Sequence, residues 1–256
     1  MRNFDANLFR QRANLVAIIA AFLANVLTNL FPFNGLTIGE ISNRFFQDVQ
    51  IIPANYAFAI WGIIYLGLIS LAIYQVLPAQ RENRRLRRIG YMLVLASIAQ
   101  IVWVFFFQNL LFPFSLVAML LILLPLMTIY WQLGIGENQV SRQEKWFLHI
   151  PISIYLGWIS VATIVNVAIV LYSLGWNGWG ISPPIWTAIM LLVAAGIAAI
   201  IIKKRVDIAF PCVIIWALVA IAVRQANQTL ILATAAGLAF GLGLFLALSI
   251  WRRRQA

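Results

Sequence analysis

The chain has 256 residues, of which 63% are hydrophobic and 10% charged, and its formal net charge is +11. Soluble domains contain about half apolar and about a quarter charged residues, so this composition argues against an ordinary soluble enzyme, a disordered tail and a disulfide scaffold. The single cysteine, Cys212, lies inside an apolar run, so no intrachain disulfide can form. The composition therefore predicts a polytopic membrane protein.

Eight apolar runs approach the roughly 20 residues that a helix needs to cross a bilayer core. In chain order they are Leu15–Leu30, Tyr56–Leu77, Ile89–Phe107, Leu116–Leu133, Phe147–Leu174, Ile185–Ile202, Ile208–Val223 and Leu230–Trp251. The first and seventh runs are short. The first run, which follows several arginines, has a cleaved signal peptide as its alternative, but no small-x-small cleavage site with a polar mature start follows it. We expect an all-α membrane helix bundle of eight spans.

Lysine and arginine residues concentrate at alternate connections between these runs. The N-terminus, the second, fourth and sixth connections and the C-terminus hold 3, 5, 2, 3 and 3 of them, and only Arg44 and Arg224 lie in the odd connections. Because such residues gather on the cytoplasmic side, the pattern predicts that both termini are cytoplasmic. It also accounts for the charge of +11 without a nucleic-acid partner. The basic run Arg81–Arg88 is best explained as the positive-inside signal, and binding of anionic lipid could accompany it.

The ten tryptophans divide into two groups by their position in the spans. Six lie near predicted span ends, where amphipathic rings settle among lipid headgroups: Trp131, Trp146, Trp176, Trp179, Trp186 and Trp251. The other four lie deeper and need either core packing or a ligand: Trp61, Trp103, Trp158 and Trp216.

The connection 31–55 is the one long loop, and it is rich in aromatic residues, proline and glycine. Long loops without regular structure are usually functional or disordered. The apolar content favours a loop that folds over the non-cytoplasmic mouth of the bundle. A loop that merely lies on the headgroups is the alternative.

No Asp, Glu, Lys, Arg or His lies in the central part of any predicted span. Ionisable groups inside a membrane mark proton relays and ion paths, so their absence argues against a proton-coupled transporter. The only histidine, His149, is far in sequence from Cys212, and no set of three or four metal ligands is present. We therefore expect no metal site, no required cofactor and no conventional catalysis, and we do not expect an enzyme.

Aromatic and neutral polar side chains share one face on each of three predicted spans, at the i, i+3, i+4 spacing of a helix. They are Phe58, Trp61 and Tyr65 in the second span, Gln100 and Trp103 in the third, and Tyr155, Trp158, Ala162 and Asn166, with Thr163 adjacent, in the fifth. Each polar group taken singly is more often a link between helices. Together, such faces could line a mostly apolar pocket for a flat ligand.

Small residues form two further faces, one around Gly237, Gly241 and Gly243 in the last span and one over 194–199 in the sixth. Such faces let helices approach closely. Packing among the last three spans and formation of a homodimer are both open explanations.

Three of these segments resemble motifs of the tryptophan-rich sensory protein family, also called TspO/MBR or translocator proteins. Segment 53–65, PANYAFAIWGIIY, resembles the family's P-x-W-x-F-x-P-V-W-x-x-L-Y. Segment 97–106, SIAQIVWVFF, resembles Q-L-x-L-N-x-x-W-S-x-x-F-F, and segment 151–166, PISIYLGWISVATIVN, resembles P-Y-L-A-W-x-x-F-A-T-x-L-N. The resemblance covers about residues 14–175.

The resemblance implies a five-helix core over residues 1–175, and a three-helix membrane extension over 176–256 then follows it. It also implies a pocket for porphyrins or other hydrophobic ligands beneath the 31–55 loop. The ligand-binding site expected from the three motifs and from the shared helix faces comprises Tyr56, Trp61, Tyr65, Gln100, Trp103, Trp158, Ala162, Thr163 and Asn166. The chain departs from the motifs at Tyr56, where the family usually has Trp, and at Ile60, which interrupts the usual Pro-Val-Trp. No Arg or Lys directly follows Tyr172, so the family's proposed cholesterol motif is missing.

The sequence thus predicts a membrane sensor that binds a flat hydrophobic ligand, such as a porphyrin or other tetrapyrrole, in a multi-pass protein of a bacterial-type cytoplasmic membrane. The expected partners are membrane lipid and the hydrophobic ligand, with a homodimer left open and no nucleic acid. An uncoupled transporter or exporter of hydrophobic molecules is one alternative. A structural or assembly partner in the membrane is the other.

Overall fold

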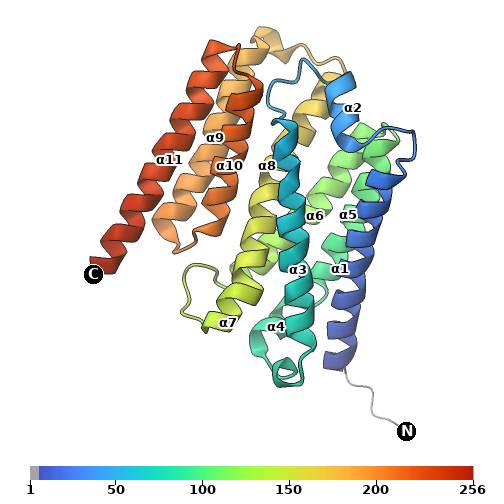
Figure 1. The fold of residues 1–256 in the computed structure, drawn as a ribbon, viewed down its shortest axis with the longest axis vertical. Helices are drawn as coiled ribbons and strands as arrows, with labels where there is room; N and C mark the ends of the chain where they lie inside the picture. Colours follow the sequence, from blue (N-terminus) through green and yellow to red (C-terminus); the bar gives the residue numbers. More distant parts are fainter. Residues whose placement is uncertain (1–5, 256) are drawn as a thin grey trace.

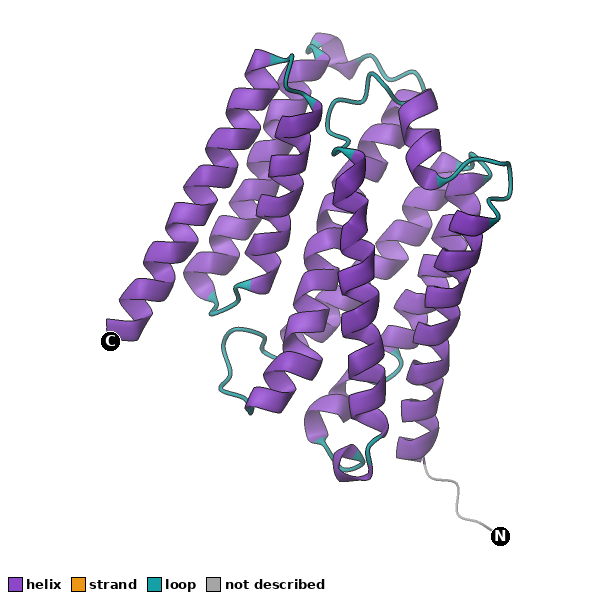
Figure 2. Cartoon of the chain, viewed as in Figure 1, coloured by secondary structure: helices purple, strands orange, loops and turns teal. Residues whose placement is uncertain are grey.

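The computed structural model describes residues 6–255, apart from the side chain of Arg254, and every regular element in that range is helical (Figure 2). The α-helices are α1 (Ala6–Leu30), α2 (Ile38–Phe45), α3 (Ile60–Val76), α4 (Arg84–Ile89), α5 (Met92–Gln108), α6 (Phe112–Gln132), α7 (Arg142–Glu144), α8 (Ile150–Ser173), α9 (Pro183–Lys204), α10 (Ala209–Arg224) and α11 (Thr229–Gln255). Short 3-10 or π segments lie between them, namely η1 (Asn55–Ala59), η2 (Pro78–Gln80), η3 (Lys145–His149) and η4 (Gly178–Gly180). The prediction of an all-α membrane helix bundle is confirmed.

Six helical segments of the described chain are long and apolar enough to cross a membrane. Two further apolar helices, α5 and α10, are shorter, with 17 and 16 residues. They correspond to the third and seventh predicted runs. The third run was expected to begin at Ile89, but α4 ends there and Gly90, with φ of +57°, separates it from α5. A positive φ suits glycine, so the break lies where the sequence can form it.

Helix α1 begins at Ala6, well before the apolar run that predicted it, and its early polar side chains are buried. Asn14 donates from Nδ2 to the carbonyl oxygen of Gly90 at 3.1 Å and to Oε1 of Gln75 at 3.4 Å. Gln11 donates to the carbonyl oxygen of Gln80 at 3.5 Å. These polar contacts fix α1 to α3 and to the turn before α5, so this end of the helix is longer than an apolar pattern alone indicates.

The helices form two groups that lie side by side (Figure 1). Helices α1, α3, α5, α6 and α8 make one group, and α9, α10 and α11 make the other. Helix α10 packs on α8 as well as on α9 and α11, whereas α11 contacts mainly α9 and α10. Helix α10 therefore makes most of the helix contact between the last three helices and the rest of the chain, and α9 adds a smaller contact with α8. The two ends of the described chain lie at the end of the bundle that carries α4 and α7, and α2 lies at the opposite end (Figure 1).

A buried carboxylate joins the two groups at the end that carries α4 and α7. Asp207, 6% exposed, lies just before α10 and accepts hydrogen bonds on Oδ2 from the hydroxyls of Tyr130 in α6, at 2.7 Å, and Ser153 in α8. Its Oδ1 accepts from the backbone N–H of Ala209 at 3.0 Å, at the start of α10. Because a buried carboxylate must be hydrogen-bonded, this one residue ties three helices together. Asp207 lies outside the apolar runs, so the sequence did not single it out.

At the same end, the connection between α6 and α7 contacts the connection between α9 and α10 at Gly136. Its carbonyl oxygen accepts from the backbone N–H of Val206 at 2.6 Å. Gly136 has φ of +78°, and a Cβ there would lie 2.8 Å from the Cβ of Arg205. Arg205 in turn pairs with Glu137 at 3.1 Å and lies over the ring of Tyr130 at 5.0 Å. Glycine is thus required where the two connections touch.

The glycines of α11 point away from the chain's own helices. Ala235 and Ala239 are buried, whereas a Cβ at Gly237 or Gly241 would meet nothing within 4 Å. Packing among the last three helices therefore uses a different face of α11. Association with another helix through the glycines stays a prediction.

Candidate ligand pocket

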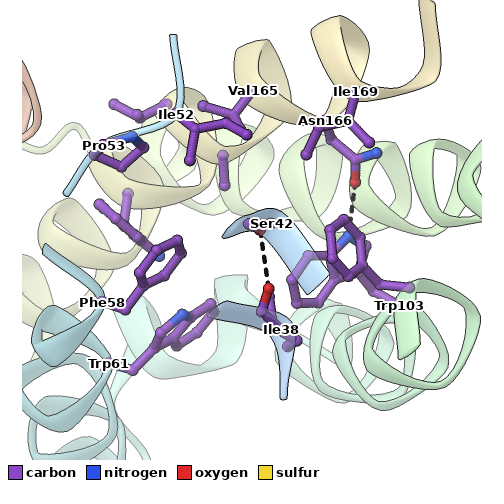
Figure 3. Close-up of a pocket in the computed structure, with 14 residues that line it drawn as sticks. Ile38, Ser42, Ile52, Pro53, Phe58, Trp61, Trp103, Val165, Asn166 and Ile169 are labelled. Atoms are coloured by element: carbon purple, nitrogen blue, oxygen red, sulfur yellow. Dashed lines mark hydrogen bonds between the residues drawn. The ribbon is translucent and has the colours of Figure 1, made fainter. Parts of the chain in front are cut away.

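A pocket lies at the α2 end of the first helix group, between the 31–55 loop and the helices beneath it (Figure 3). Helix α2 and the segment after it cover one side, and η1, α3, α5 and α8 form the rest. The lining residues are Ile38, Ser42, Ile52, Pro53, Phe58, Trp61, Trp103, Phe107, Trp158, Val161, Ala162, Val165, Asn166 and Ile169. Most of them are apolar or aromatic, as is usual for a binding site for a small hydrophobic molecule.

One wall is fixed by a buried hydrogen-bond network. The indole Nε1–H of Trp103 donates to Oδ1 of Asn166 at 2.7 Å, which joins α5 to α8 (Figure 3). The Asn166 amide donates in turn to Oγ of Ser115 in α6 at 3.0 Å. Asn166 and Trp103 are 2% and 7% exposed. Asn166 was expected to bind the ligand directly, but its first contacts in this conformation are to protein, and they hold the Trp103 ring against the pocket.

The other aromatic walls pack edge to face. The rings of Phe58 and Trp158 lie 5.9 Å apart at 87°, and those of Trp61 and Tyr155 lie 6.1 Å apart at 64°. Such T-shaped pairs each add about 0.5–1.5 kcal/mol to area burial. The rings are therefore held in place by contacts within the protein.

The cavity itself is small, with a volume of about 40 Å³. One water needs about 10–15 Å³ on this measure, so there is room for a few waters and not for a tetrapyrrole. Ile38 and Ser42 from α2, with Ile52 and Pro53 after it, line one side of the cavity (Figure 3). We call the segment 38–53 the lid. A large ligand fits among these rings only if part of the lining moves away.

The lid helix has its own start signal. Thr37 and Glu40 form a capping box, in which Thr37 Oγ1 accepts from the Glu40 backbone N–H at 3.3 Å and Glu40 Oε2 accepts from the Thr37 backbone N–H at 2.7 Å. The hydrogen bonds that the Glu40 carboxylate accepts from the backbone N–H and from the hydroxyl of Thr37 lower its pKa. The box lets a helix of 8 residues form inside the loop.

The structure places five of the nine expected site residues on the pocket wall, namely Trp61, Trp103, Trp158, Ala162 and Asn166. The other four lie elsewhere. The ring of Tyr56 contacts Trp216 of α10, and Tyr65 lies behind Trp61 with its hydroxyl directed to the Ala21 carbonyl oxygen at 3.3 Å. Gln100 is 1% exposed and faces Tyr155, at 3.5 Å from its hydroxyl, and Thr163 donates to the carbonyl of its own helix at Ile159.

Several lining residues were not among the expected site residues, and two sets of them differ in whether the sequence could have shown them. Val161, Val165 and Ile169 extend the face of Trp158 along α8, and the helical period could have found them. Ile38 and Ser42 could not be found that way, since their position depends on how α2 folds back over the bundle.

The pocket offers stacking and apolar burial, with one amide and one hydroxyl at its edges. Ser42 Oγ donates to the Ile38 carbonyl oxygen at 2.9 Å, so both polar groups already have partners (Figure 3). Within residues 6–255 no group of three His, Cys, Asp or Glu residues could hold a metal ion. The arrangement is suited to binding a hydrophobic molecule by shape.

A family model described as TSPO-like protein matches residues 11–249 of the chain. The match continues through α9, α10 and α11, beyond the residues 14–175 over which the three motifs show the resemblance. No curated protein and no solved structure matches the chain. The match covers nearly the whole sequence, and it agrees with a helical bundle that holds six membrane-length apolar helices. The chain is an integral, multi-pass membrane protein, and it belongs to the TSPO-like protein family.

Proposed function

We propose that the protein binds a flat hydrophobic ligand, of the porphyrin or tetrapyrrole class, in the pocket between α3, α5 and α8, and that it acts as a membrane sensor of that ligand. The observation that carries the proposal is the arrangement of Trp61, Trp103 and Trp158 around one cavity. Three large rings from three helices can bury a planar molecule on several sides. Each stacked contact would add about 0.5–1.5 kcal/mol beyond area burial.

Under this proposal the protein is not an enzyme. Its pocket wall carries no acid, base or cysteine, and the two polar side chains that reach it are Ser42 and Asn166. Its proposed partners are the ligand and membrane lipid, and its proposed location is a bacterial-type cytoplasmic membrane with both termini inside. Membrane integration itself follows from the family and from the apolar helices.

The steric test is to fill the pocket with Ala162→Phe. The purified protein in nanodiscs is titrated with protoporphyrin IX while the porphyrin absorption band and tryptophan quenching are followed. The native protein is expected to bind saturably, and A162F is expected to bind at least about tenfold more weakly, since a ring would occupy the ligand's place. The matched control is Val167→Phe, on the same helix but exposed and outside the pocket lining.

Two results would contradict the pocket assignment. One is non-saturable binding by the native protein, and the other is equal affinity in A162F and V167F. Flux of protoporphyrin across vesicles that contain the protein would favour the uncoupled transporter, and binding without flux would favour the sensor.

A further inference from the structure

The lid is attached to α10, which belongs to the last three helices. The backbone N–H of Ala54 donates to the carbonyl oxygen of Ala220 at 3.1 Å, and the indole N–H of Trp216 donates to that of Ala57 at 3.2 Å. The Gln225 amide donates to the carbonyl oxygen of Gln50 at 3.0 Å. The segment that leads out of the lid is thus bound along one helix of the other group.

Arg224, the last residue of α10, contacts the lid in two places. Its Nη1 lies 2.9 Å from Oδ1 of Asn43, on α2, and 3.4 Å from the carbonyl oxygen of Pro53, which lines the pocket. Asn43 donates in turn to Oδ1 of Asn55 at 3.2 Å. The guanidinium therefore bridges the lid helix to the end of the lid segment, and it is the one α10 side chain among these contacts that reaches α2.

The position of Arg224 is also exceptional in the sequence. It is one of two cations in the odd connections, on the side where the other sixteen basic residues do not lie. The topological pattern does not explain a positive charge there. A charge-assisted hydrogen bond to the lid explains the positive charge at position 224. Such hydrogen bonds are stronger than neutral ones and strengthen further where water is scarce.

We propose that α10 is a latch for the pocket lid, and that Arg224 is the positioning residue that holds α2 closed over the aromatic cavity. The proposal rests on the proposed function in that the lid covers the ligand site. In the latched state Ile38 and Ser42 line one side of a cavity of about 40 Å³. Release of Asn43 and Pro53 by Arg224 frees α2, while Gln50, Ala54 and Ala57 keep their hydrogen bonds to Gln225, Ala220 and Trp216. The last three helices thereby set how often the pocket opens.

The direct test measures lid opening without any ligand. The lone Cys212 is exposed, so it is first replaced by Ala, and Ser42→Cys then places a thiol on the pocket face of α2, where the side chain is 3% exposed. The rate of maleimide labelling at position 42 reports the open population. Arg224→Gln is expected to raise this rate about tenfold or more, because a hydrogen bond from a charged group is lost in the closed state alone.

Asn43→Ala removes the same contact from the other side and is expected to give a similar increase. The matched control is Arg253→Gln, since Arg253 donates to the Ile202 carbonyl oxygen at 3.1 Å, between α11 and α9 and away from the lid. An unchanged rate in R224Q, or an equal rise in R253Q, would overturn the latch. Melting temperatures of all variants show whether an increase comes from general loosening, which would also count against it.

The same variants separate the latch from the ligand assignment. With protoporphyrin IX, R224Q is expected to show association and dissociation rates that are both several-fold faster than those of the native protein. If no variant binds porphyrin while maleimide labelling at position 42 is still faster in R224Q, the proposed ligand is wrong and the latch stands. If porphyrin binds but labelling is insensitive to Arg224, the latch is wrong and the pocket stands.

Discussion

At the scale of single residues, Asn166 does most to define the pocket. It accepts from the indole of Trp103 and donates to Ser115, so three helices meet at one buried amide. Sequence spacing placed Asn166 and Trp103 on facing surfaces, but it could not show that they bind each other. Side-chain partners across helices depend on the packing of both helices, which a single helical period does not contain.

Asn166→Ala is expected to lower the free energy of unfolding by about 2 kcal/mol, because the buried indole N–H of Trp103 loses its acceptor. Denaturant unfolding in detergent micelles, followed by tryptophan fluorescence, measures the change. Asn29→Ala is the control, since Asn29 is exposed and donates only within α1. If N166A and N29A lower the free energy of unfolding by the same small amount, the hydrogen bonds of Asn166 do not stabilise the pocket wall.

At the scale of elements, α8 and α10 form the closest contact between the two groups of helices. A Cβ on Gly157 of α8 would lie 3.1 Å from the Cβ of Val213 and 3.3 Å from the carbonyl oxygen of Phe210, both in α10. A side chain at position 157 therefore fits only if the neighbouring atoms of α10 give way by a few tenths of an ångström. This contact between α8 and α10 lies next to the pocket wall, because Trp158, which lines the pocket, follows Gly157 in α8.

Gly157→Leu is therefore expected to destabilise the protein by about 1–3 kcal/mol, as overpacking does in a close-packed interior. The melting temperature in nanodiscs measures this effect. Gly196→Leu on α9 is the matched control, because a Cβ there meets nothing within 4 Å. If G157L and G196L have the same melting temperature, α8 and α10 do not pack as closely as described.

The sequence predicted the helices well and the polar contacts between them poorly. Apolar runs located the long helices because burial in lipid requires continuous hydrophobicity. The start of α1 was missed because Gln11 and Asn14 are satisfied by distant partners. A loop over the pocket was predicted, but its contact with Arg224 was not, because Arg224 lies far along the chain. Asp207 was missed because it lies in a charged connection, where nothing in the sequence shows that it is buried.

At the scale of the whole molecule, α10 touches the core at both of its ends. Asp207 fixes its start to Tyr130 and Ser153, and Arg224 fixes its end to the lid. The last three helices are thus attached at both ends of α10, with the Gly157 contact between these ends. Removal of the first attachment should weaken the whole arrangement.

Asp207→Ala is expected to reduce the free energy of unfolding by about 2–4 kcal/mol, because two buried hydroxyls and the N–H of Ala209 lose their acceptor. Chemical denaturation in micelles measures this free energy of unfolding. The control is Glu137→Ala, since Glu137 is the half-exposed ion-pair partner of Arg205. A loss no greater than that of the control would mean that Asp207 does not join the two groups.

The most direct test of the central claim is a structure of the protein determined with protoporphyrin IX. The ligand is predicted to lie among Trp61, Trp103 and Trp158, beside Ala162, with Ile38 and Ser42 moved off the pocket. Porphyrin bound elsewhere, or an aromatic cavity unchanged beneath a closed lid at saturating ligand, would contradict the account.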